Sequence, residues 1–373
     1  MVLKLVTIVE QLNAAFVMSN KRQSAMRINE HRCFCFRGQL KALLLLAGLY
    51  VQSSLLEERQ MQLRLTLLVF ILLSFPISLL AKVLNGFNID NASVPSQFIQ
   101  KGGPPKDGIP ALNQPEFIKG NEAKFMHAQD IVLGLQVGDV VKAYPIRILN
   151  WHEIVNDQFS GTRYVISYCP LCGSGMAFLS QPTGEREALD FGVSGLLYNS
   201  DVLMYDRKTE SLWSQIHGEA IAGALVGRKL KQVPLTLSRW SNWLARYSDS
   251  LVLSTNTGYQ RDYRRDPYAG YGKNAAIYFP VANQAPNEYH PKEMVLGFKV
   301  EQSTIAFPFS EISQLATQQQ SFELGGDRYY VHWDSSNQSA WITDEKGETQ
   351  PSTLLFWFAW YAFYPETQVY KWQ

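Results

Sequence analysis

Cysteine is scarce in this chain, with four residues among 373. Two of them precede a segment with the layout of an export signal, which leaves Cys169 and Cys172 in the run Tyr168-Cys-Pro-Leu-Cys-Gly173. A chain of this length buries a core without disulfide bonds, so its size does not explain the pair. In an oxidising compartment a lone Cys-x-x-Cys is a disulfide, a redox centre or a thiolate pair protected by a metal.

An excess of basic charge is also absent. Residues 1–81 hold nine of the 34 Lys and Arg and four of the 33 Asp and Glu, which leaves 25 basic and 29 acidic residues in the remainder. Surfaces that bind nucleic acid depend on clustered positive charge. The composition therefore argues against a nucleic-acid partner.

Apolar runs of membrane-spanning length are nearly absent as well. The segment that starts at Met61, MQLRLTLLVFILLSFPISLLA, has the basic Arg64, then an apolar run, then small residues up to Ala81. This is the layout of a secretory signal peptide. Its apolar run, 65–81, has 17 residues, the lower limit for crossing a bilayer. We expect an exported, periplasmic protein, with an uncleaved membrane anchor at 65–81 as the alternative.

The position of this signal bears on the residues before it. A signal peptide begins at the N-terminus, whereas 60 residues precede Met61. We therefore predict that 1–60 is a non-native extension and that the true start is Met61, with a cytoplasmic tail as the alternative. Residues 82–115 are rich in Asn, Gly, Pro and Ser and predict an extended lead-in. Residues 116–373 predict a single globular domain.

Short strands that alternate with turn signals predict the fold class. Aromatic residues make up 13% of the chain, which favours strands. Residues 132–144 form two alternating runs joined by Gly138-Asp139, the pattern of a β-hairpin. Helices are predicted over 146–159 and from Ser238 onward. We expect an α+β, strand-rich fold with a few short helices in one compact domain.

The hairpin sequence recurs later in the chain. Residues 132–145 align without gaps to 295–308, with six of 14 positions identical, and counting on from the next shared glycine brings Cys169 opposite Asp334. We therefore predict two related β-units, each a hairpin with further strands. The predicted units span residues 130–180 and 293–345. Because the second unit has no cysteine in this turn, the fold does not require the thiols, which favours a chemical role for them.

The residues after Cys172 decide the geometry of the motif. In thioredoxin-like proteins the motif opens a helix, whose N-terminus lowers the pKa of the first cysteine. Here Gly173-Ser-Gly175 follows, which disfavours a helix and favours a tight turn between strands, the form of a metal knuckle. A knuckle supplies two ligands of four. The candidates for the others are His152, His217 and Met204, a set that suits copper or zinc.

The first functional hypothesis is a thiol-disulfide oxidoreductase with an unidentified redox partner. Cys169 would be the attacking thiolate, Cys172 the resolving thiol and His152 a nearby base. Asp201 and Asp206 are further acid–base candidates, although their positions favour turn and strand-end roles.

Two alternatives to redox chemistry stay open. One is a copper- or zinc-binding protein that uses the cysteine pair and histidine, with a metal-delivery partner. The other is a structural disulfide in a non-catalytic envelope domain. A disulfide within Cys-x-x-Cys closes a very small loop and contributes little entropically, which counts against the last reading.

Taken together, these motifs resemble the bacterial domain-of-unknown-function family 3179 (DUF3179). The segments that carry the resemblance are Ala143-Tyr-Pro145, Trp151-His-Glu-Ile-Val-Asn-Asp157, Tyr168-Cys-Pro-Leu-Cys-Gly173, Phe191-Gly-Val-Ser-Gly195, Asn199-Ser-Asp201, Met204-Tyr-Asp206 and Ser211-Leu-Trp213. The resemblance covers roughly residues 105–370. It implies an exported bacterial domain without an established activity. Some members are predicted selenoproteins, which implies redox use of the cysteine pair.

Overall fold

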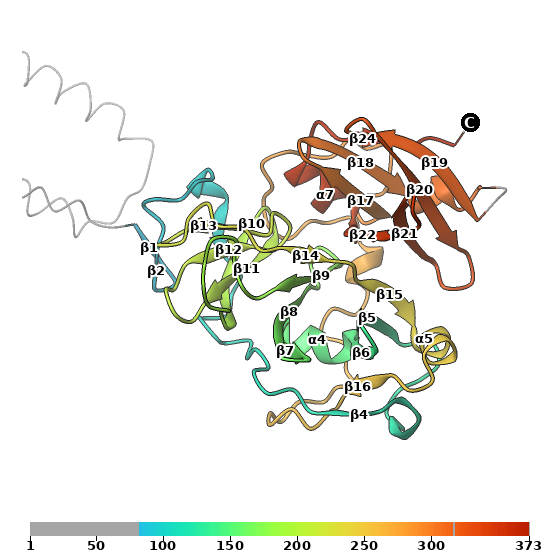
Figure 1. Cartoon of the computed structure of the whole chain (residues 1–373). Coiled ribbons are helices and arrows are strands. Elements are labelled where there is room, and N and C mark those ends of the chain that lie inside the picture. The colour runs from blue at the N-terminus through green and yellow to red at the C-terminus, as the bar shows by residue number, and fades with distance from the viewer. Residues whose placement is uncertain (1–81, 316–317, 373) are drawn as a thin grey trace, which may run out of the picture. The chain divides into compact units, whose positions relative to one another are not determined.

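Antiparallel strands dominate the computed structural model, which describes residues 82–315 and 318–372 (Figure 1). Apart from a short hairpin of β1 (Val83–Leu84) and β2 (Phe87–Asn88), the described strands form five sheets. The first has the order β13-β12-β11-β10-β3: Glu219–Ala222, Leu212–Ser214, Asp201–Asp206, Phe191–Tyr198 and Ile99–Lys101. The second has the order β14-β9-β8-β7: Gln232–Val233, Ser174–Leu179, Thr162–Cys169 and Ile154–Phe159.

The other three sheets contain the strands beyond Pro234 together with β4 and the early hairpin. The third has the order β15-β5-β6-β16-β4: Thr236–Arg239, Ile131–Val137, Val140–Pro145, Leu251–Leu253 and Phe117–Lys119. The fourth has the order β23-β17-β18-β24: Thr353–Phe356, Met294–Val300, Ser303–Pro308 and Gln368–Val369. The fifth has the order β19-β20-β21-β22: Gln319–Leu324, Asp327–Asp334, Ser339–Asp344 and Thr349–Gln350.

Helices are few and short in the described part of the chain. The α-helices are α4 (Ile146–His152), α5 (Trp240–Arg246), α6 (Phe309–Ile312) and α7 (Trp357–Phe363), and the 3-10 helices are η1 (Ser96–Phe98), η2 (Gly120–Glu122) and η3 (Tyr271–Lys273). None of the described helices is long and apolar enough to cross a membrane. The predicted extension 1–60 and signal segment 61–81 lie outside the described residues.

The predicted fold class, an α+β domain of two related β-units in one compact body, is wrong. The five small sheets are arranged as the blades of a five-bladed β-propeller. One predicted helix, 146–159, also differs: α4 ends at His152, Glu153 takes a positive φ of 57°, and β7 starts at Ile154. Hydrophobic periodicity finds local elements, but it does not show how strands far apart in sequence pair.

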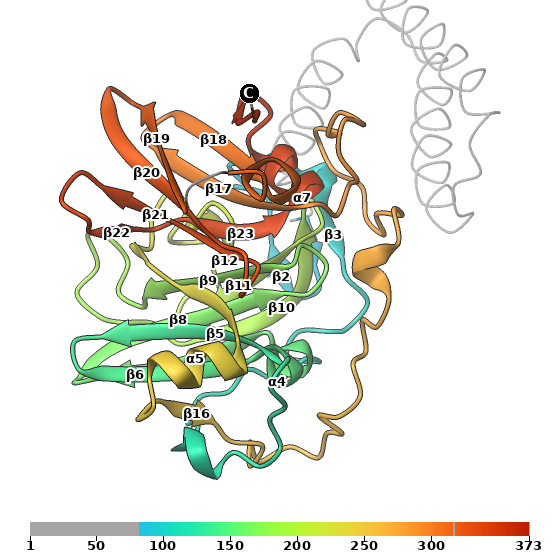
Figure 2. The ribbon, with the colours of Figure 1, turned by 90° about the vertical axis from the view of Figure 1, so that its right-hand side faces the viewer.

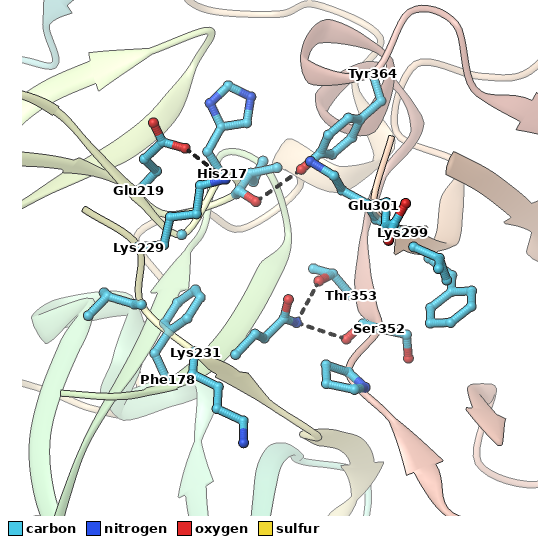
Figure 3. Close-up of a pocket in the computed structure, with 18 of the residues that line it drawn as sticks. Phe178, His217, Glu219, Lys229, Lys231, Lys299, Glu301, Ser352, Thr353 and Tyr364 are labelled. Carbon is cyan, nitrogen blue, oxygen red and sulfur yellow. Dashed lines mark hydrogen bonds and ion pairs between the residues drawn. The ribbon is translucent and has the colours of Figure 1, made fainter. Parts of the chain in front are cut away.

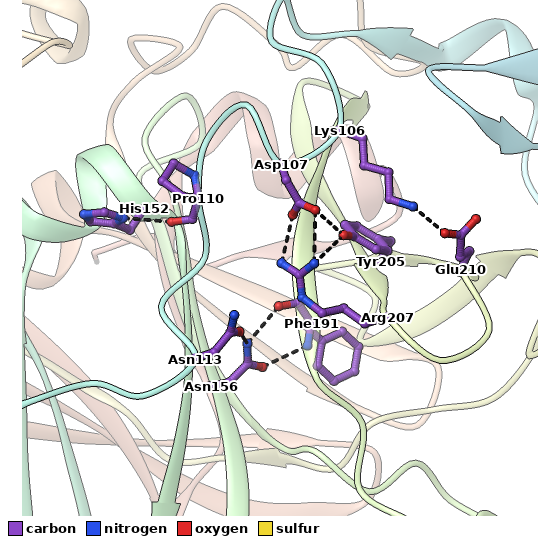
Figure 4. Close-up of polar contacts among 10 residues, drawn as sticks. All are labelled: Lys106, Asp107, Pro110, Asn113, His152, Asn156, Phe191, Tyr205, Arg207 and Glu210. Carbon is purple, nitrogen blue, oxygen red and sulfur yellow. Dashed lines mark hydrogen bonds and ion pairs between the residues drawn. The ribbon is translucent and has the colours of Figure 1, made fainter. Parts of the chain in front are cut away.

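The predicted lead-in, 82–115, is fastened to the first sheet. Its strand β3 pairs with β10, so that Ile99 lies opposite Tyr198. Farther along, the Asp107 carboxylate accepts a hydrogen bond from the Tyr205 hydroxyl. It also accepts two hydrogen bonds from the Arg207 guanidinium, at 2.9 and 3.0 Å (Figure 4). These contacts make the lead-in part of the folded structure.

The two segments that align in sequence also follow the same course in space. In both hairpins the first valine pairs with the closing proline, Val132 with Pro145 in β5–β6 and Val295 with Pro308 in β17–β18. A later strand and helix then return to each hairpin, β15 with α5 to β5 and β23 with α7 to β17. Figure 2 shows α7 beside β17 and β23.

The cysteine turn has a counterpart in the second segment. Cys169 at the end of β8 pairs with Ser174, just as Asp334 at the end of β20 pairs with Ser339. In the second turn the Asn337 side-chain amide donates to the Asp334 carboxylate at 2.8 Å, where the first turn has its second cysteine. The same backbone turn is therefore built once with two thiols and once with an acid and an amide.

Candidate metal centre

The cysteine turn joins two strands, and no helix follows it. The Cys172 amide donates to the Cys169 carbonyl oxygen at 3.2 Å, and Gly173 reverses the chain with a φ of 62°. A Cβ at this glycine would also lie 3.1 Å from the Phe356 ring. The position therefore favours glycine for both its backbone angle and its space. The turn points both thiols inward, and the two residues are at most 1% exposed.

A carboxylate from another sheet lies beside the two thiols. Asp201 begins β11 directly after a two-residue turn in which Asn199 and Ser200 both have positive φ, 52° and 66°. One ligand atom each from Cys169, Cys172 and Asp201 lies within 4.8 Å of the other two, and all three residues are buried. The Ser200 carbonyl oxygen accepts from both thiols, at 3.9 and 3.4 Å.

A buried polar network holds the carboxylate in place. The Ile216 amide donates to the Asp201 carboxylate at 3.2 Å, and the Ser174 hydroxyl lies 3.5 Å from its other oxygen. The Gln215 side chain accepts from Ser174 at 2.6 Å and donates to the Ser167 hydroxyl at 3.0 Å. Backbone and side-chain groups outside the cysteine pair thus help to hold the carboxylate.

Burial disfavours the charged form of every acid in this cluster. It raises the pKa of Asp201 to about 7 and the pKa of Glu153 to about 8, in the second case with a contribution from the charge of Asp201. Burial also raises the pKa of the Cys169 thiol and, by more, that of Cys172. No Lys or Arg of the described residues is among the main causes of these shifts.

Glu153 is a second acid at the site whose importance the sequence did not show. It lies between α4 and β7 in the strained left-handed region, with its amide bonded to Leu149 and its carbonyl oxygen accepting from Tyr168, both at 2.8 Å. Its side chain is buried. The signal that could have found it is an acidic residue at the junction between a helix and an apolar strand.

The segment 271–282 covers the cluster from the other side. The Ser200 hydroxyl donates to the Phe279 carbonyl oxygen at 2.7 Å, and the Asn199 side chain accepts from the Ala282 amide at 2.8 Å. At the start of the segment, Tyr271 is 5% exposed and its hydroxyl has no hydrogen-bond partner among the described residues. The polar turn that places Asp201 thus also anchors the covering segment.

Comparison with known proteins shows which family the chain belongs to. A family model described as a protein of unknown function (DUF3179) matches residues 106–367. The chain belongs to the DUF3179 family. The matched range contains the two cysteines, Asp201, Glu153 and Tyr271. No curated protein and no solved structure matches the chain.

In this DUF3179 chain His152 has both ring nitrogens occupied away from the cysteine cluster. Its Nδ1 lies 2.8 Å from the Pro110 carbonyl oxygen, so it donates there (Figure 4). Its Nε2 then accepts from the Tyr263 hydroxyl at 2.7 Å. Burial lowers the pKa of His152 to about 4. The group of ligand atoms around the thiols does not include it.

The other predicted ligands of this DUF3179 member lie apart from the ligand group or within apolar packing. His217 meets the edge of the Phe363 ring at 4.8 Å and lines a cavity of about 1140 Å³ together with Lys229 and Lys299 (Figure 3). Met204 is buried on β11 opposite Trp213. The third ligand atom near the two thiols belongs to Asp201, for which the sequence favoured a turn or strand-end role.

Proposed function

We propose that this DUF3179 protein binds a divalent metal ion, with zinc the best match, through Cys169, Cys172 and Asp201. The observation that carries the proposal is the convergence of their three ligand atoms within 4.8 Å in a fully buried position. Two sheets supply the ligands, and the hydrogen bonds described above hold the carboxylate without a metal. A site prepared in this way needs little reorganisation to accept an ion.

The charge balance of the cluster supports a cation. Cys169, Cys172, Asp201 and Glu153 interact with one another, and burial penalises each negative charge, so without a cation the protonated forms are favoured. Metal binding displaces those protons, because thiolate and carboxylate are the ligating forms. A divalent ion would supply the positive charge that no described side chain provides.

The donor set favours zinc over copper. Thiolates suit both zinc and Cu(I), but a carboxylate is a hard oxygen donor that suits zinc much better than Cu(I). Zinc sites with three protein ligands commonly keep a fourth position for water or another small molecule. Two thiolates and one carboxylate are compatible with this pattern.

A thiol-disulfide role is the second candidate, and Asp201 is what favours it. A carboxyl with a pKa of about 7 beside a dithiol could take up a proton as a thiolate forms. Oxidation to a disulfide would release two electrons and two protons, which a partner disulfide would accept on becoming a dithiol. However, reactive thiols are partly exposed with a lowered pKa, whereas these two are buried with a raised pKa. The metal proposal therefore ranks first.

We also infer that the site works outside the cytoplasm. The support is the signal-like layout of residues 61–81 in the sequence. In an oxidising compartment a bound metal would protect the two thiolates from disulfide formation. A metal-delivery partner would then meet the protein after export.

Cobalt titration tests the metal proposal. Reduced, metal-free protein is expected to bind one Co²⁺ with thiolate-to-cobalt charge-transfer absorption, and zinc should displace it. Cys169→Ser and Asp201→Asn should each weaken binding by more than the roughly 10–100-fold typical of losing an outer-shell partner.

The matched control is Asp334→Asn, because Asp334 occupies the corresponding turn of the second segment. It should leave cobalt binding unchanged. A wild-type protein without thiolate-to-cobalt absorption would refute the metal proposal. If that protein instead formed a Cys169–Cys172 disulfide with a potential above about −250 mV, the redox candidate would take its place.

A further inference from the structure

The proposed metal site has three protein ligands and lacks a fourth. Within the described residues, no further His, Cys or acid belongs to the group formed by Cys169, Cys172 and Asp201. Zinc and cobalt at such sites take a fourth ligand from solution when the protein supplies three. Two residues around the cluster, Tyr271 and Glu153, indicate how the protein shapes that fourth position.

Tyr271 has a buried hydroxyl without a partner. The residue is 5% exposed, and its hydroxyl is one of few buried side-chain polar atoms in the described structure that make no hydrogen bond. A buried tyrosine normally satisfies its hydroxyl, since leaving it unpaired is costly. An unpaired hydroxyl at this depth therefore points to a missing ligand or water.

The position of Tyr271 links that hydroxyl to the thiols. Its ring lies 6.5 Å from the ring of Phe356, whose amide donates to the Cys172 carbonyl oxygen at 2.8 Å. The same Phe356 ring lies over the cysteine turn, since a Cβ at Gly173 would be 3.1 Å from it. The hydroxyl therefore belongs to the surroundings of the cluster.

A buried lysine fixes Tyr271 in this orientation. The Lys292 ammonium lies 3.4 Å from the centre of the Tyr271 ring. It also donates to the carbonyl oxygens of Tyr271 and Ala276, both at 2.8 Å. Because one cation holds both the ring and the backbone, the tyrosine cannot turn freely to satisfy its hydroxyl elsewhere.

The backbone of Glu153 is strained next to the strand that pairs with the cysteine strand. Its φ is 57° and its side chain is 6% exposed. Strain of this kind costs about 1–3 kcal/mol and persists where the surrounding structure enforces it, often at functional sites. The strained residue and the unpaired Tyr271 hydroxyl come from separate parts of the chain.

We propose that the metal at Cys169, Cys172 and Asp201 keeps one coordination position for a small anion or oxygen-donor ligand, to which the Tyr271 hydroxyl donates a hydrogen bond. This inference rests on the proposed metal function. The covering segment leaves the cysteines at most 1% exposed, so the ligand must be small. The site is then an open one that can bind and polarise a ligand, and not a closed structural zinc site.

Azide binding to the cobalt form tests the proposal. With the purified full chain loaded with Co²⁺, azide is expected to shift the visible cobalt absorption of the wild type. Tyr271→Phe should weaken azide binding about tenfold through loss of the hydrogen bond, while cobalt affinity stays the same. The metal-free variant should unfold at the same temperature as the wild type or higher, because an unsatisfied hydroxyl has been removed.

Tyr278→Phe is the matched control. Tyr278 packs against Tyr271 with ring centres 4.7 Å apart but is 60% exposed, so its loss should leave azide binding unchanged. Cobalt bound without any response to azide would overturn the open position. Equal azide affinity in Tyr271→Phe and wild type would overturn the role of the tyrosine. A wild type that binds no cobalt would refute the metal function itself and this inference with it.

Discussion

Buried ionisable residues in this protein fall into two groups according to their partners. His152 uses both ring nitrogens in hydrogen bonds to Pro110 and Tyr263. Tyr271 is also buried, yet its hydroxyl makes no hydrogen bond within the described structure. A buried polar group that lacks a partner calls for an explanation such as a ligand that completes it. This contrast favours Tyr271 over His152 as a functional residue.

The neutral state of His152 predicts a pH dependence of stability. Its pKa is lowered from 6.5 to about 4 in the folded protein, so between these values the unfolded chain binds more protons. The free energy of unfolding should therefore fall as the pH falls from 6.5 towards 4, by as much as about 3 kcal/mol for this residue. Denaturant unfolding at several pH values measures the slope, and His152→Gln should make it shallower.

Part of that slope should survive in His152→Gln, because burial also lowers the pKa of His217 to about 4. A slope unchanged in His152→Gln would mean that His152 has the same pKa in the folded protein as in the unfolded chain. It would then again be a candidate acid or base for the site.

The sequence pointed to some site residues and missed others for a physical reason. Cys169 and Cys172 stand out because they are rare and close in sequence. Asp201 joins them only because two different sheets meet, and periodicity carries no information on that meeting. Glu153 was hidden for another reason: the predicted helix ran through it, whereas the chain switches there from helix to strand.

At the level of elements, each aligned hairpin is built around a glycine that a tryptophan covers. A Cβ at Gly134 of β5 would lie 2.1 Å from the Trp243 ring of α5. A Cβ at Gly297 of β17 would lie 2.2 Å from the Trp360 ring of α7. Both indoles also donate at their far end, to Ser250 at 2.8 Å and Thr367 at 2.9 Å. The helices are thus fixed to their hairpins by two contacts each.

These contacts predict that Gly134→Ala and Gly297→Ala are destabilising. The added methyl group cannot fit unless the indole moves and strains its hydrogen bond, so each substitution should cost about 1–3 kcal/mol or more in the free energy of unfolding. Urea denaturation measures the change. Gly272→Ala is the control, because a Cβ there would meet only Phe356 at an ordinary 3.6 Å.

A change within about 0.5 kcal/mol, as for an ordinary surface substitution, is expected for Gly272→Ala. Equal stability of Gly134→Ala and wild type would show that α5 is loosely attached.

The hairpins themselves were predictable, since Gly138-Asp139 marks the turn between β5 and β6 and the alternating apolar residues set its register. The glycine–tryptophan contacts were not, because more than 60 residues separate the partners along the chain.

At the level of the whole molecule, the strand that returns to each aligned hairpin also contacts the other unit. Strand β23, which pairs with β17, lies against β9, and β15, which pairs with β5, lies against β21. The main core cluster also joins Cys169 and Cys172 with Trp357 and Phe358 of α7. The fold class could not be predicted from the sequence because these contacts join strands that are far apart in the chain. The proposed metal site is therefore held by distant parts of the described chain and not by its own turn alone.

This coupling predicts that a distant substitution exposes the thiols. In reduced, metal-free protein the buried cysteines should react with a disulfide reagent only when the structure opens. If opening is global and in rapid equilibrium, Gly297→Ala should speed the reaction about tenfold for each 1.4 kcal/mol that it costs in urea denaturation. Stopped-flow measurement of the thiol reaction gives the rate. An unchanged rate despite lower stability would show that the segment 271–282 opens by itself, and the cysteines would then be reachable by a partner without unfolding of the sheets.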